Sequence, residues 1–185
     1  MIPVQTLGSG AFSKVYKTVD GYAAKVIDKK RIRDMGLSNH VKVEIDNHRS
    51  LDHPNIVKLH SVHETDTHII LLLDYVEGEE LYQKCKLKLW EVEAKKLVEQ
   101  ILSALAYLHK KHIMHLDIKP ENIMVTHNNE IKLIDMGISR KFVWESEVRC
   151  GTAGYIAPEV LRQHKANDRA DVFSTGIVLY SLLSF

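Results

Sequence analysis

The sequence has few cysteines and lacks an excess of either charge. Both features exclude several classes of protein. Only Cys85 and Cys150 occur among the 185 residues, without a CxxC pair, so we expect neither a disulfide scaffold nor a cysteine zinc site. The 25 Lys and Arg residues nearly balance the 24 Asp and Glu residues, which leaves a formal net charge of +1. Bulk electrostatic attraction therefore gives no reason to expect nucleic acid or a membrane surface as a partner.

Long apolar runs and targeting signals are missing as well. The N-terminal sequence, MIPVQTLGSG, lacks the basic segment and the apolar run of a signal peptide. The longest apolar stretches, HIILLL and GIVLYSLL, are too short to span a bilayer. With 45% apolar residues the chain can bury a sizeable core, and these features together favour an intracellular, cytoplasmic protein.

The first part of the chain has the pattern of a sheet. Two short apolar stretches within residues 4–18 flank a glycine-rich turn, and Asp20-Gly21 favours a tight hairpin turn before a strand at residues 22–28. The other elements predicted in this part are a polar helix and two further strands, at residues 39–51, 56–63 and 67–75.

The character of the sequence changes at Glu77-Gly78, where we place the boundary between two lobes, residues 1–76 and 77–185. Beyond it, apolar residues recur at offsets of three and four, as on one face of a helix. These residues are Ala94, Leu97, Val98, Ile101, Leu102, Leu105 and Leu108. Two short strands are predicted around Asn128-Asn129. The final stretch, VFSTGIVLYSLLSF, is apolar on nearly every side of a helix, so we expect the chain to be part of a larger domain.

A glycine-containing loop near the start is a candidate phosphate-binding element. Glycine lets a backbone approach phosphates closely, although an ordinary hairpin gives the same pattern. The loop comprises Leu7, Gly8, Ser9, Gly10, Ala11, Phe12, Ser13, Lys14 and Val15. Lys25, on the predicted third strand, can neutralise phosphate oxygens, and Glu44 in the polar helix can pair with it. The alternative for both side chains is a solvent-facing position.

A more specific pattern is the segment HLDIKPEN, followed later by DMG. Asp117, Lys119 and Asn122 can place a base, a cation and a metal ligand on one short loop. Asp135, in DMG, can supply a second metal-ligand carboxylate, and magnesium favours such oxygen ligands when it also binds substrate phosphates. The combination indicates phosphoryl transfer.

These motifs resemble those of eukaryotic protein kinases over essentially the whole chain, from the glycine-rich loop through GTAGYIAPE to DVFSTG. The resemblance implies an α+β, two-lobed protein-kinase-like fold, with an antiparallel sheet in the small lobe and a mainly helical, incomplete large lobe. It also implies transfer of the γ-phosphoryl group of ATP, with Mg2+, to hydroxyls of protein substrates. Lys119 in DIKPEN and Thr152 in GTAGYIAPE are typical of the serine/threonine type.

Within that family, HLDIKPENIM and IKLIDMG are most similar to the calmodulin-dependent and myosin-light-chain kinase branch. This similarity implies a calmodulin-like or other regulator that acts through flanking sequence. By the same resemblance Asp117 is the catalytic base, Lys119 contacts the γ-phosphate, and Asn122 completes the catalytic loop. The magnesium ligands are then Asn122 and Asp135.

The resemblance also assigns the nucleotide contacts. Lys25 holds the α and β phosphates and is orientated by Glu44. The hinge that meets the adenine runs from Leu73 to Val76, and Glu80 is placed for the ribose. Besides the residues of the glycine-rich loop, the positions counted as nucleotide-binding are Ala23, Lys25, Glu44, Leu73, Asp74, Val76, Glu80 and Met124.

Several positions depart from the family pattern. Ser13 stands where a third loop glycine is common, Met136 replaces the phenylalanine of DFG, and Phe173 replaces a tryptophan. His48, one helical turn after Glu44, occupies a position where an aliphatic residue is more usual, and we expect a neutral, packed histidine there.

Leu116 is a further departure, because many kinases have an arginine there that binds a phosphate on the activation segment. We therefore expect activity that does not depend on such a phosphate. Thr152 is expected to bond with Asp117 and Lys119 rather than to accept a phosphate. Ser139 and Ser146 remain candidate hydroxyls. The competing hypothesis is a phosphate on Ser146 bound by Arg140, Lys141 and Arg149.

Two other classes of function compete with an active kinase. A pseudokinase or nucleotide-binding scaffold fits the same fold, but the catalytic positions are all present. A small-molecule phosphotransferase on a related fold is disfavoured by the segment Ala157-Pro158-Glu159. Eleven histidines, some at HxxH spacing, also raise the question of a zinc site, which we do not expect.

Overall fold

The computed structural model describes residues 2–87, 89–136, 140–141, 151–163 and 166–184, with the side chains of residues 140, 141 and 163 left out. The contacts within the chain divide it into two compact units. The first comprises the residues up to Asp52 together with Val57–Val76, and the second comprises His53–Ile56 together with the residues from Glu77 onward. The division by sequence had assigned His53–Ile56 to the first unit.

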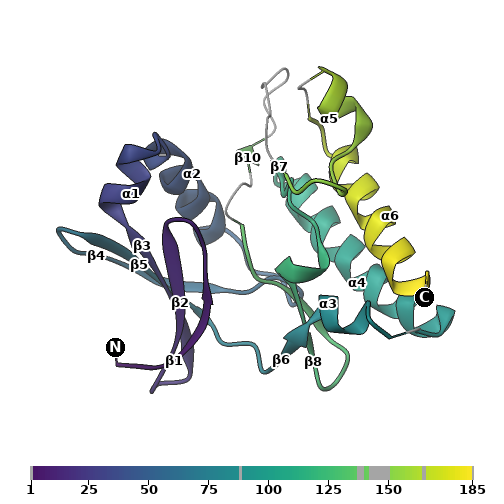
Figure 1. Ribbon diagram of the computed structural model, residues 1–185, viewed down its shortest axis with the longest axis horizontal. Coiled ribbons are helices and arrows are strands. Elements are labelled where there is room, and N and C mark those ends of the chain that lie inside the picture. The colour runs from purple at the N-terminus through teal and green to yellow at the C-terminus, as the bar shows by residue number, and fades with distance from the viewer. Residues whose placement is uncertain (1, 88, 137–139, 142–150, 164–165, 185) are drawn as a thin grey trace. The chain divides into compact units, whose positions relative to one another are not determined.

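The first unit contains a five-stranded antiparallel sheet with the strand order β1-β2-β3-β5-β4 (Figure 1). Its strands are β1 Pro3–Ser9, β2 Ser13–Thr18, β3 Tyr22–Asp28, β4 Leu59–Glu64 and β5 His68–Asp74. The predicted hairpins are confirmed, and Gly21 has a φ of 81°, which glycine adopts without strain. The strand predicted from residue 56 begins at Leu59 instead, because Ile56 forms a parallel bridge with Leu133 in the second unit.

Two helices pack on this sheet. The helix predicted at residues 39–51 is α2, Ser38–Arg49. A short helix, α1 at Lys29–Asp34, was not predicted, and the Asp28 carboxylate caps it by accepting the backbone N–H groups of Lys30 and Arg31. Buried apolar residues from both helices, the sheet and the segment between α2 and β4 form one core: Ala23, Ile27, Ile32, Val41, Ile45, Val57, Leu59, Leu71 and Leu73.

The second unit is built around helices and two small sheets. The helices are α3 Leu81–Lys84, α4 Glu91–Lys110, α5 Pro158–Gln163 and α6 Arg169–Leu183, with a 3-10 turn at Pro120–Asn122. The strands are β6 Gly78–Glu80, β7 Ile113–Met114, β8 Ile123–Thr126, β9 Ile131–Leu133 and β10 Arg140–Lys141. They form the sheets β6-β8-β9 and β10-β7. The strands β8 and β9 are the pair predicted around Asn128-Asn129.

The predicted apolar face of α4 is buried, except that Leu102 is exposed. Hydrogen bonds explain why His53–Ile56 belong to this unit. The side chain of Asn55 donates to Gln100 Oε1 on α4, at 3.1 Å, and to the carbonyl of Ile131 on β9, at 3.0 Å. The ring of His53 lies beside that of Tyr107, with centroids 5.1 Å apart.

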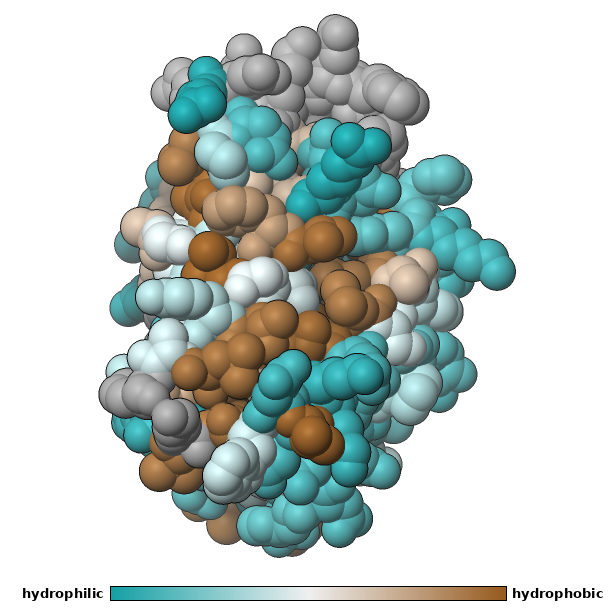
Figure 2. Space-filling model, turned by 90° about the vertical axis from the view of Figure 1, so that its right-hand side faces the viewer, coloured by the Kyte–Doolittle hydropathy of each residue, from teal (hydrophilic) through white to brown (hydrophobic). Residues whose placement is uncertain are grey.

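The helix α6 is apolar around most of its circumference, and only part of that surface is buried. Val178 and Leu182 are fully buried. Apolar side chains on the same helix are exposed to solvent: Val172, Phe173, Tyr180 and Leu183. Figure 2 shows apolar side chains gathered on the face of the second unit to which α6 contributes. No helix among the described residues is both long and apolar enough to cross a membrane.

Candidate active site

The glycine-rich loop joins β1 and β2 and is largely exposed. The N–H of Gly10 donates to the carbonyl of Ser13 at 2.8 Å, which closes the tip of the loop. Gly8 pairs with Val15, and a Cβ atom built on Gly8 meets no heavy atom within 4 Å. The predicted loop residues therefore form one hairpin whose backbone is accessible to a ligand.

Lys25 and Glu44 form a buried ion pair within the first unit. Lys25 lies on β3, between Val15 of β2 and Leu71 of β5, and Glu44 lies on α2. The Lys25 Nζ atom is 2.8 Å from Glu44 Oε1, and the two side chains are 12% and 3% exposed. The alternative that both side chains face solvent is therefore wrong. Such a pair fixes the position of the ammonium group, because a buried charge needs its partner.

The other predicted nucleotide contacts are placed by strand register. In the first unit, Ala23 on β3 pairs directly with Leu73 on β5, and both are buried. Asp74 ends β5, and Val76, half-buried, is the last residue of the unit. In the second unit, Glu80 on β6 pairs with Met124 on β8.

The predicted catalytic residues converge on the carboxylate of Asp117. Thr152 donates its hydroxyl to Asp117 Oδ1 at 2.6 Å. Asn122 donates through Nδ2 to Asp117 Oδ2 at 2.8 Å, and Lys119 Nζ lies 3.1 Å from the same oxygen. Lys119 also donates to the Thr152 hydroxyl at 2.7 Å. The bonds expected from Thr152 to Asp117 and Lys119 are thus present, and they hold the carboxylate in one orientation.

The loop that carries Thr152 depends on its glycine. Gly151 has a φ of 116°, a conformation that other residues rarely adopt, and a Cβ there would lie 2.9 Å from Ile156 Cγ1. Ser139, Ser146 and Arg149 lie outside the described residues. Arg140 and Lys141 are described only as the backbone of β10.

Asn122 and Asp135 provide the candidate ligand atoms for magnesium. Both N–H bonds of the Asn122 amide go to Asp117, one to its carbonyl at 2.9 Å and one to its carboxylate. The amide oxygen of Asn122 is therefore the atom that remains for a metal, and it is a hard oxygen ligand, as is the carboxylate of Asp135. Magnesium uses one or two such protein ligands with substrate phosphates, so these residues fit it. Within the described ranges, no group of three or more His, Cys, Asp or Glu could hold a metal by itself.

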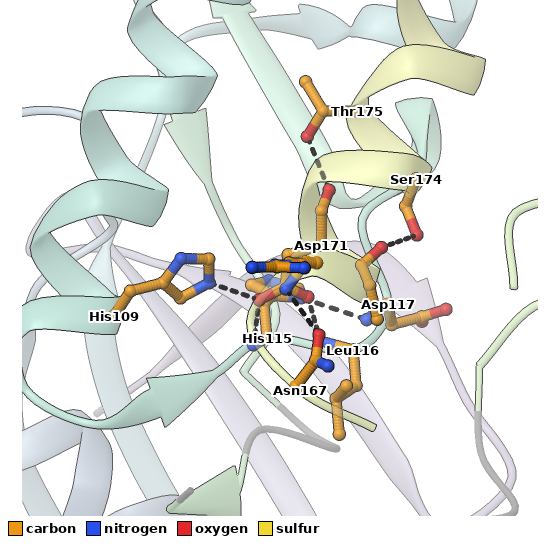
Figure 3. Close-up of polar contacts among 10 residues, drawn as sticks. His109, His115, Leu116, Asp117, Asn167, Asp171, Ser174 and Thr175 are labelled. Atoms are coloured by element: carbon orange, nitrogen blue, oxygen red, sulfur yellow. Dashed lines mark hydrogen bonds and ion pairs between the residues drawn. The ribbon is translucent and has the colours of Figure 1, made fainter. Parts of the chain in front are cut away.

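Asp171, at the start of α6, holds the backbone of the catalytic loop in place, and no role was predicted for it from the sequence. Its side chain is fully buried and accepts the backbone N–H groups of His115 and Leu116, at 2.9 and 2.7 Å (Figure 3). His109 Nε2 on α4 lies 2.7 Å from the same carboxylate. A sequence signal existed, because Asp171 is the only charged residue from position 170 onward and a buried carboxylate requires partners.

These bonds hold Leu116 in an unusual conformation. Its φ is 66°, in the left-handed region that costs a leucine roughly 1 kcal/mol or more. The side chain of Leu116 packs in an apolar cluster with Met114, Ala157, Val160 and Ala170. Leu116 therefore links the catalytic loop to the segment after Thr152 by apolar packing. A charged residue at position 116 would instead need a charged partner.

Each of the two units contains a buried histidine. Burial lowers the pKa of His115, although the nearby carboxylates of Asp171, Asp117 and Asp135 act in the opposite direction. His48 in the first unit is 2% exposed, and its Nε2 lies 2.7 Å from the carbonyl of Val57, so that nitrogen carries a hydrogen. His48 is packed, as expected.

Comparison with known proteins gives consistent results. The chain matches the family model for the protein kinase domain over residues 2–185. It is 39% identical over 190 residues to CBL-interacting serine/threonine-protein kinase 15 of Arabidopsis thaliana, covering 96% of this chain and 45% of that protein. It is 40% identical over 193 residues to CBL-interacting serine/threonine-protein kinase 20 of the same plant, covering 96% and 43%. The human serine/threonine-protein kinase DCLK3 is 38% identical over 190 residues, covering 97% and 29%. The chain thus spans less than half the length of these relatives.

Proposed function

Since this chain belongs to the protein kinase domain family, we propose that it transfers the γ-phosphoryl group of ATP to serine and threonine hydroxyls of protein substrates. The observation that carries the proposal is the cluster of Lys119, Asn122 and Thr152 around the carboxylate of Asp117. Phosphoryl transfer requires positioning and charge neutralisation more than covalent chemistry, and this cluster supplies a fixed base and a fixed cation.

Asp117 is the base in this mechanism. An ionised carboxylate has about four acceptor positions, and Thr152, Asn122 and Lys119 together use three of them. The remaining position accepts the hydrogen of an incoming hydroxyl and takes its proton as the new P–O bond forms, while the bond between the γ-phosphorus and ADP breaks and ADP leaves. Lys119, bonded to Thr152 and Asp117, keeps its ammonium group beside the base, where it offsets the charge on the transferred group.

The nucleotide is assigned to the glycine-rich loop, Lys25 and the hinge in the first unit, and to Glu80 and Met124 in the second. Lys25 is held by Glu44, so its charge is in place before phosphate arrives. Asn122 and Asp135 would hold Mg2+, which neutralises the phosphate oxygens when bound. The backbone of the open loop provides N–H groups for the same oxygens.

We also propose that regulation comes from a partner that acts through flanking sequence, as in the calmodulin-dependent and myosin-light-chain branch. Leu116 supports this proposal, because its apolar packing provides no group to bind an activation-segment phosphate. The names of the two Arabidopsis relatives state that those kinases interact with CBL, so kinases similar to this chain have a protein partner.

The test is a phosphorylation assay with labelled ATP, Mg2+ and a generic basic protein, followed by identification of the phosphorylated amino acids. We expect phosphoserine and phosphothreonine. The Asp117→Asn protein should lose transfer by about 100-fold or more, while its ATP affinity stays within a few-fold, because Asp117 meets the hydroxyl and not the nucleotide.

Three results would contradict this proposal. Wild-type turnover in the Asp117→Asn protein would remove Asp117 from the mechanism. ATP binding without transfer by the wild-type protein would favour a nucleotide-binding scaffold. Phosphotyrosine as the main product would contradict the substrate class.

A further inference from the structure

The end of β5 has an irregular pairing with β4, immediately before the proposed adenine-binding hinge. Leu59 of β4 pairs with Leu73, and Ser61 pairs with the neighbouring Leu72. On β4 the pairing advances by two residues, whereas on β5 it advances by one. His60 is therefore unpaired and is the extra residue of a β-bulge. A bulge changes the direction of the side chain that it carries, and bulges are common beside active sites.

The side chain of His60 reaches Asp74, the residue at which β5 ends. His60 Nε2 lies 2.6 Å from Asp74 Oδ1. The other carboxylate oxygen of Asp74 accepts the backbone N–H of Lys58 at 3.2 Å, and the backbone N–H of Asp74 donates to the carbonyl of Lys58 at 3.0 Å. Both oxygens of the Asp74 carboxylate and the backbone N–H of Asp74 are thus bonded to Lys58, which precedes β4, or to His60 within β4.

Aromatic and cationic side chains of neighbouring strands also contact His60 and Tyr75. Tyr22 on β3 pairs directly with Asp74 in the sheet, and its ring meets the His60 ring edge-on at 5.0 Å between centroids. The next residue, Tyr75, has the Lys17 ammonium group 4.1 Å from its ring centroid. Asp74 and Tyr75 are therefore each held through their side chains by other strands of the first unit.

We propose that His60 is a positioning residue for nucleotide binding: through Asp74 it fixes the backbone at the start of the hinge that meets the adenine. The inference rests on the proposed function, because that function makes the hinge a binding element. Leu73 to Val76 is the segment assigned to the adenine, and Asp74 is its second residue. A hinge that is anchored at Asp74 is already arranged for the ligand, and such preorganisation increases affinity.

The anchoring role is separable from folding. The side chains of His60 and Asp74 are 33% and 35% exposed, and exposed pairs of this kind contribute little to stability. The apolar core of the unit does not include His60. Loss of the contact is therefore expected to weaken ATP binding without unfolding the protein.

The experiment compares His60→Leu with His60→Gln in the full chain. Leucine has no donor, whereas the glutamine amide can place an N–H near the position of Nε2. The dissociation constant for ATP should rise about three- to tenfold in His60→Leu and stay within about twofold in His60→Gln. At saturating ATP, kcat should remain within about twofold of wild type in both, as should the fraction of folded protein, since the catalytic loop is unaltered.

His63→Leu is the matched control, because His63 lies on the same strand and contacts only Ser61 among the interactions described for it. Its ATP affinity should be unchanged. Asp74→Asn is the second variant, and combining it with His60→Leu should weaken binding no more than His60→Leu alone, because Asp74→Asn only weakens the contact that His60→Leu has already removed.

The outcomes distinguish this inference from the proposed function. Unchanged ATP affinity in His60→Leu, or an equal loss in His63→Leu, would overturn the inference alone. A fall in kcat and melting temperature with unchanged affinity would show a merely structural role and would also overturn it. A wild-type protein that binds ATP but transfers no phosphate would overturn the proposed function, while the affinities would still test His60. A wild-type protein that binds no ATP would overturn both.

Discussion

At the scale of single residues, the hydroxyl of Thr152 is the connection between the base and the cation. It donates to Asp117 at 2.6 Å and accepts from Lys119 at 2.7 Å. Without it, the carboxylate loses one of three donors and can rotate away from the position that a substrate hydroxyl requires. We predict that Thr152→Ala lowers kcat by about ten- to a hundredfold, because small errors in position have large effects on rate.

Thr152→Ser keeps the hydroxyl and should retain most of the activity. Ser103→Ala, which removes an exposed hydroxyl on α4, serves as the control and should leave kcat unchanged. Steady-state kinetics at saturating ATP provide the measurement. If Thr152→Ala and Thr152→Ser were equally active, the bridging hydroxyl would have no part in catalysis.

The buried imidazole of His115 predicts a dependence of stability on pH. Burial lowers the pKa of His115 in the folded protein below the value of about 6.5 expected after unfolding. Below that pH the unfolded chain binds the proton more readily, so the free energy of unfolding should decrease as the pH falls. One such group contributes at most about 1.4 kcal/mol per pH unit.

Urea unfolding at several pH values between neutral and mildly acidic tests this prediction. In His115→Gln the decrease should be smaller, because the glutamine does not titrate. His127→Gln removes an exposed histidine from the same unit and should keep the wild-type decrease. A His115→Gln protein with the full wild-type pH dependence would show that another group is responsible.

At the scale of elements, the strand β6 depends on a glycine. Gly78 pairs with Thr126 of β8, and a Cβ on Gly78 would lie 2.1 Å from the carbonyl oxygen of Val125. Any side chain there must push β6 away from β8. We predict that Gly78→Ala lowers the free energy of unfolding by about 1–3 kcal/mol.

The same change should weaken ATP binding, because Glu80 and Met124 are paired across these two strands. The control is Gly176→Ala on α6, where an added Cβ meets no atom within 4 Å. That variant should be neutral or more stable by up to about 1 kcal/mol, since alanine favours a helix. Equal stabilities of the two variants in urea unfolding would contradict the steric argument.

Elements with strong local signals were predictable from the sequence, and elements that depend on distant partners were not. The strand at Tyr22–Asp28 was predicted to the residue, because a turn precedes it and its composition favours a sheet. The helix α1 was missed because Lys29–Asp34 is mostly charged, although its cap, Asp28, is a known start signal. Ile56 looked like part of a strand, but its partner, Leu133, is distant in the sequence.

The site shows the same contrast. Asp117, Lys119 and Asn122 lie within one short motif, so their proximity followed from spacing alone. The contact of Asp171 with the backbone of Leu116 joins α6 to the catalytic loop, and no local pattern specifies it. The bulge at His60 could not be predicted from the sequence either, because it is defined only by the register between β4 and β5.

At the scale of the whole molecule, the apolar surface of α6 decides how the chain behaves in solution. Val172 is 50% exposed and Tyr180 is 68% exposed. Exposed apolar patches promote association because contact removes them from water. We predict that the 185-residue chain self-associates with increasing concentration, as measured by sedimentation velocity.

A double substitution that keeps the net charge identifies the surface responsible. Val172→Glu with Tyr180→Lys should reduce association, because it places charges on α6 without altering the net charge. The matched control is Val19→Glu with Met35→Lys, which makes the same changes at exposed apolar positions of the first unit and should leave association unchanged. A wild-type chain that sediments as a monomer at every concentration would contradict the prediction. Equal effects of the two double substitutions would show that α6 is not the surface involved.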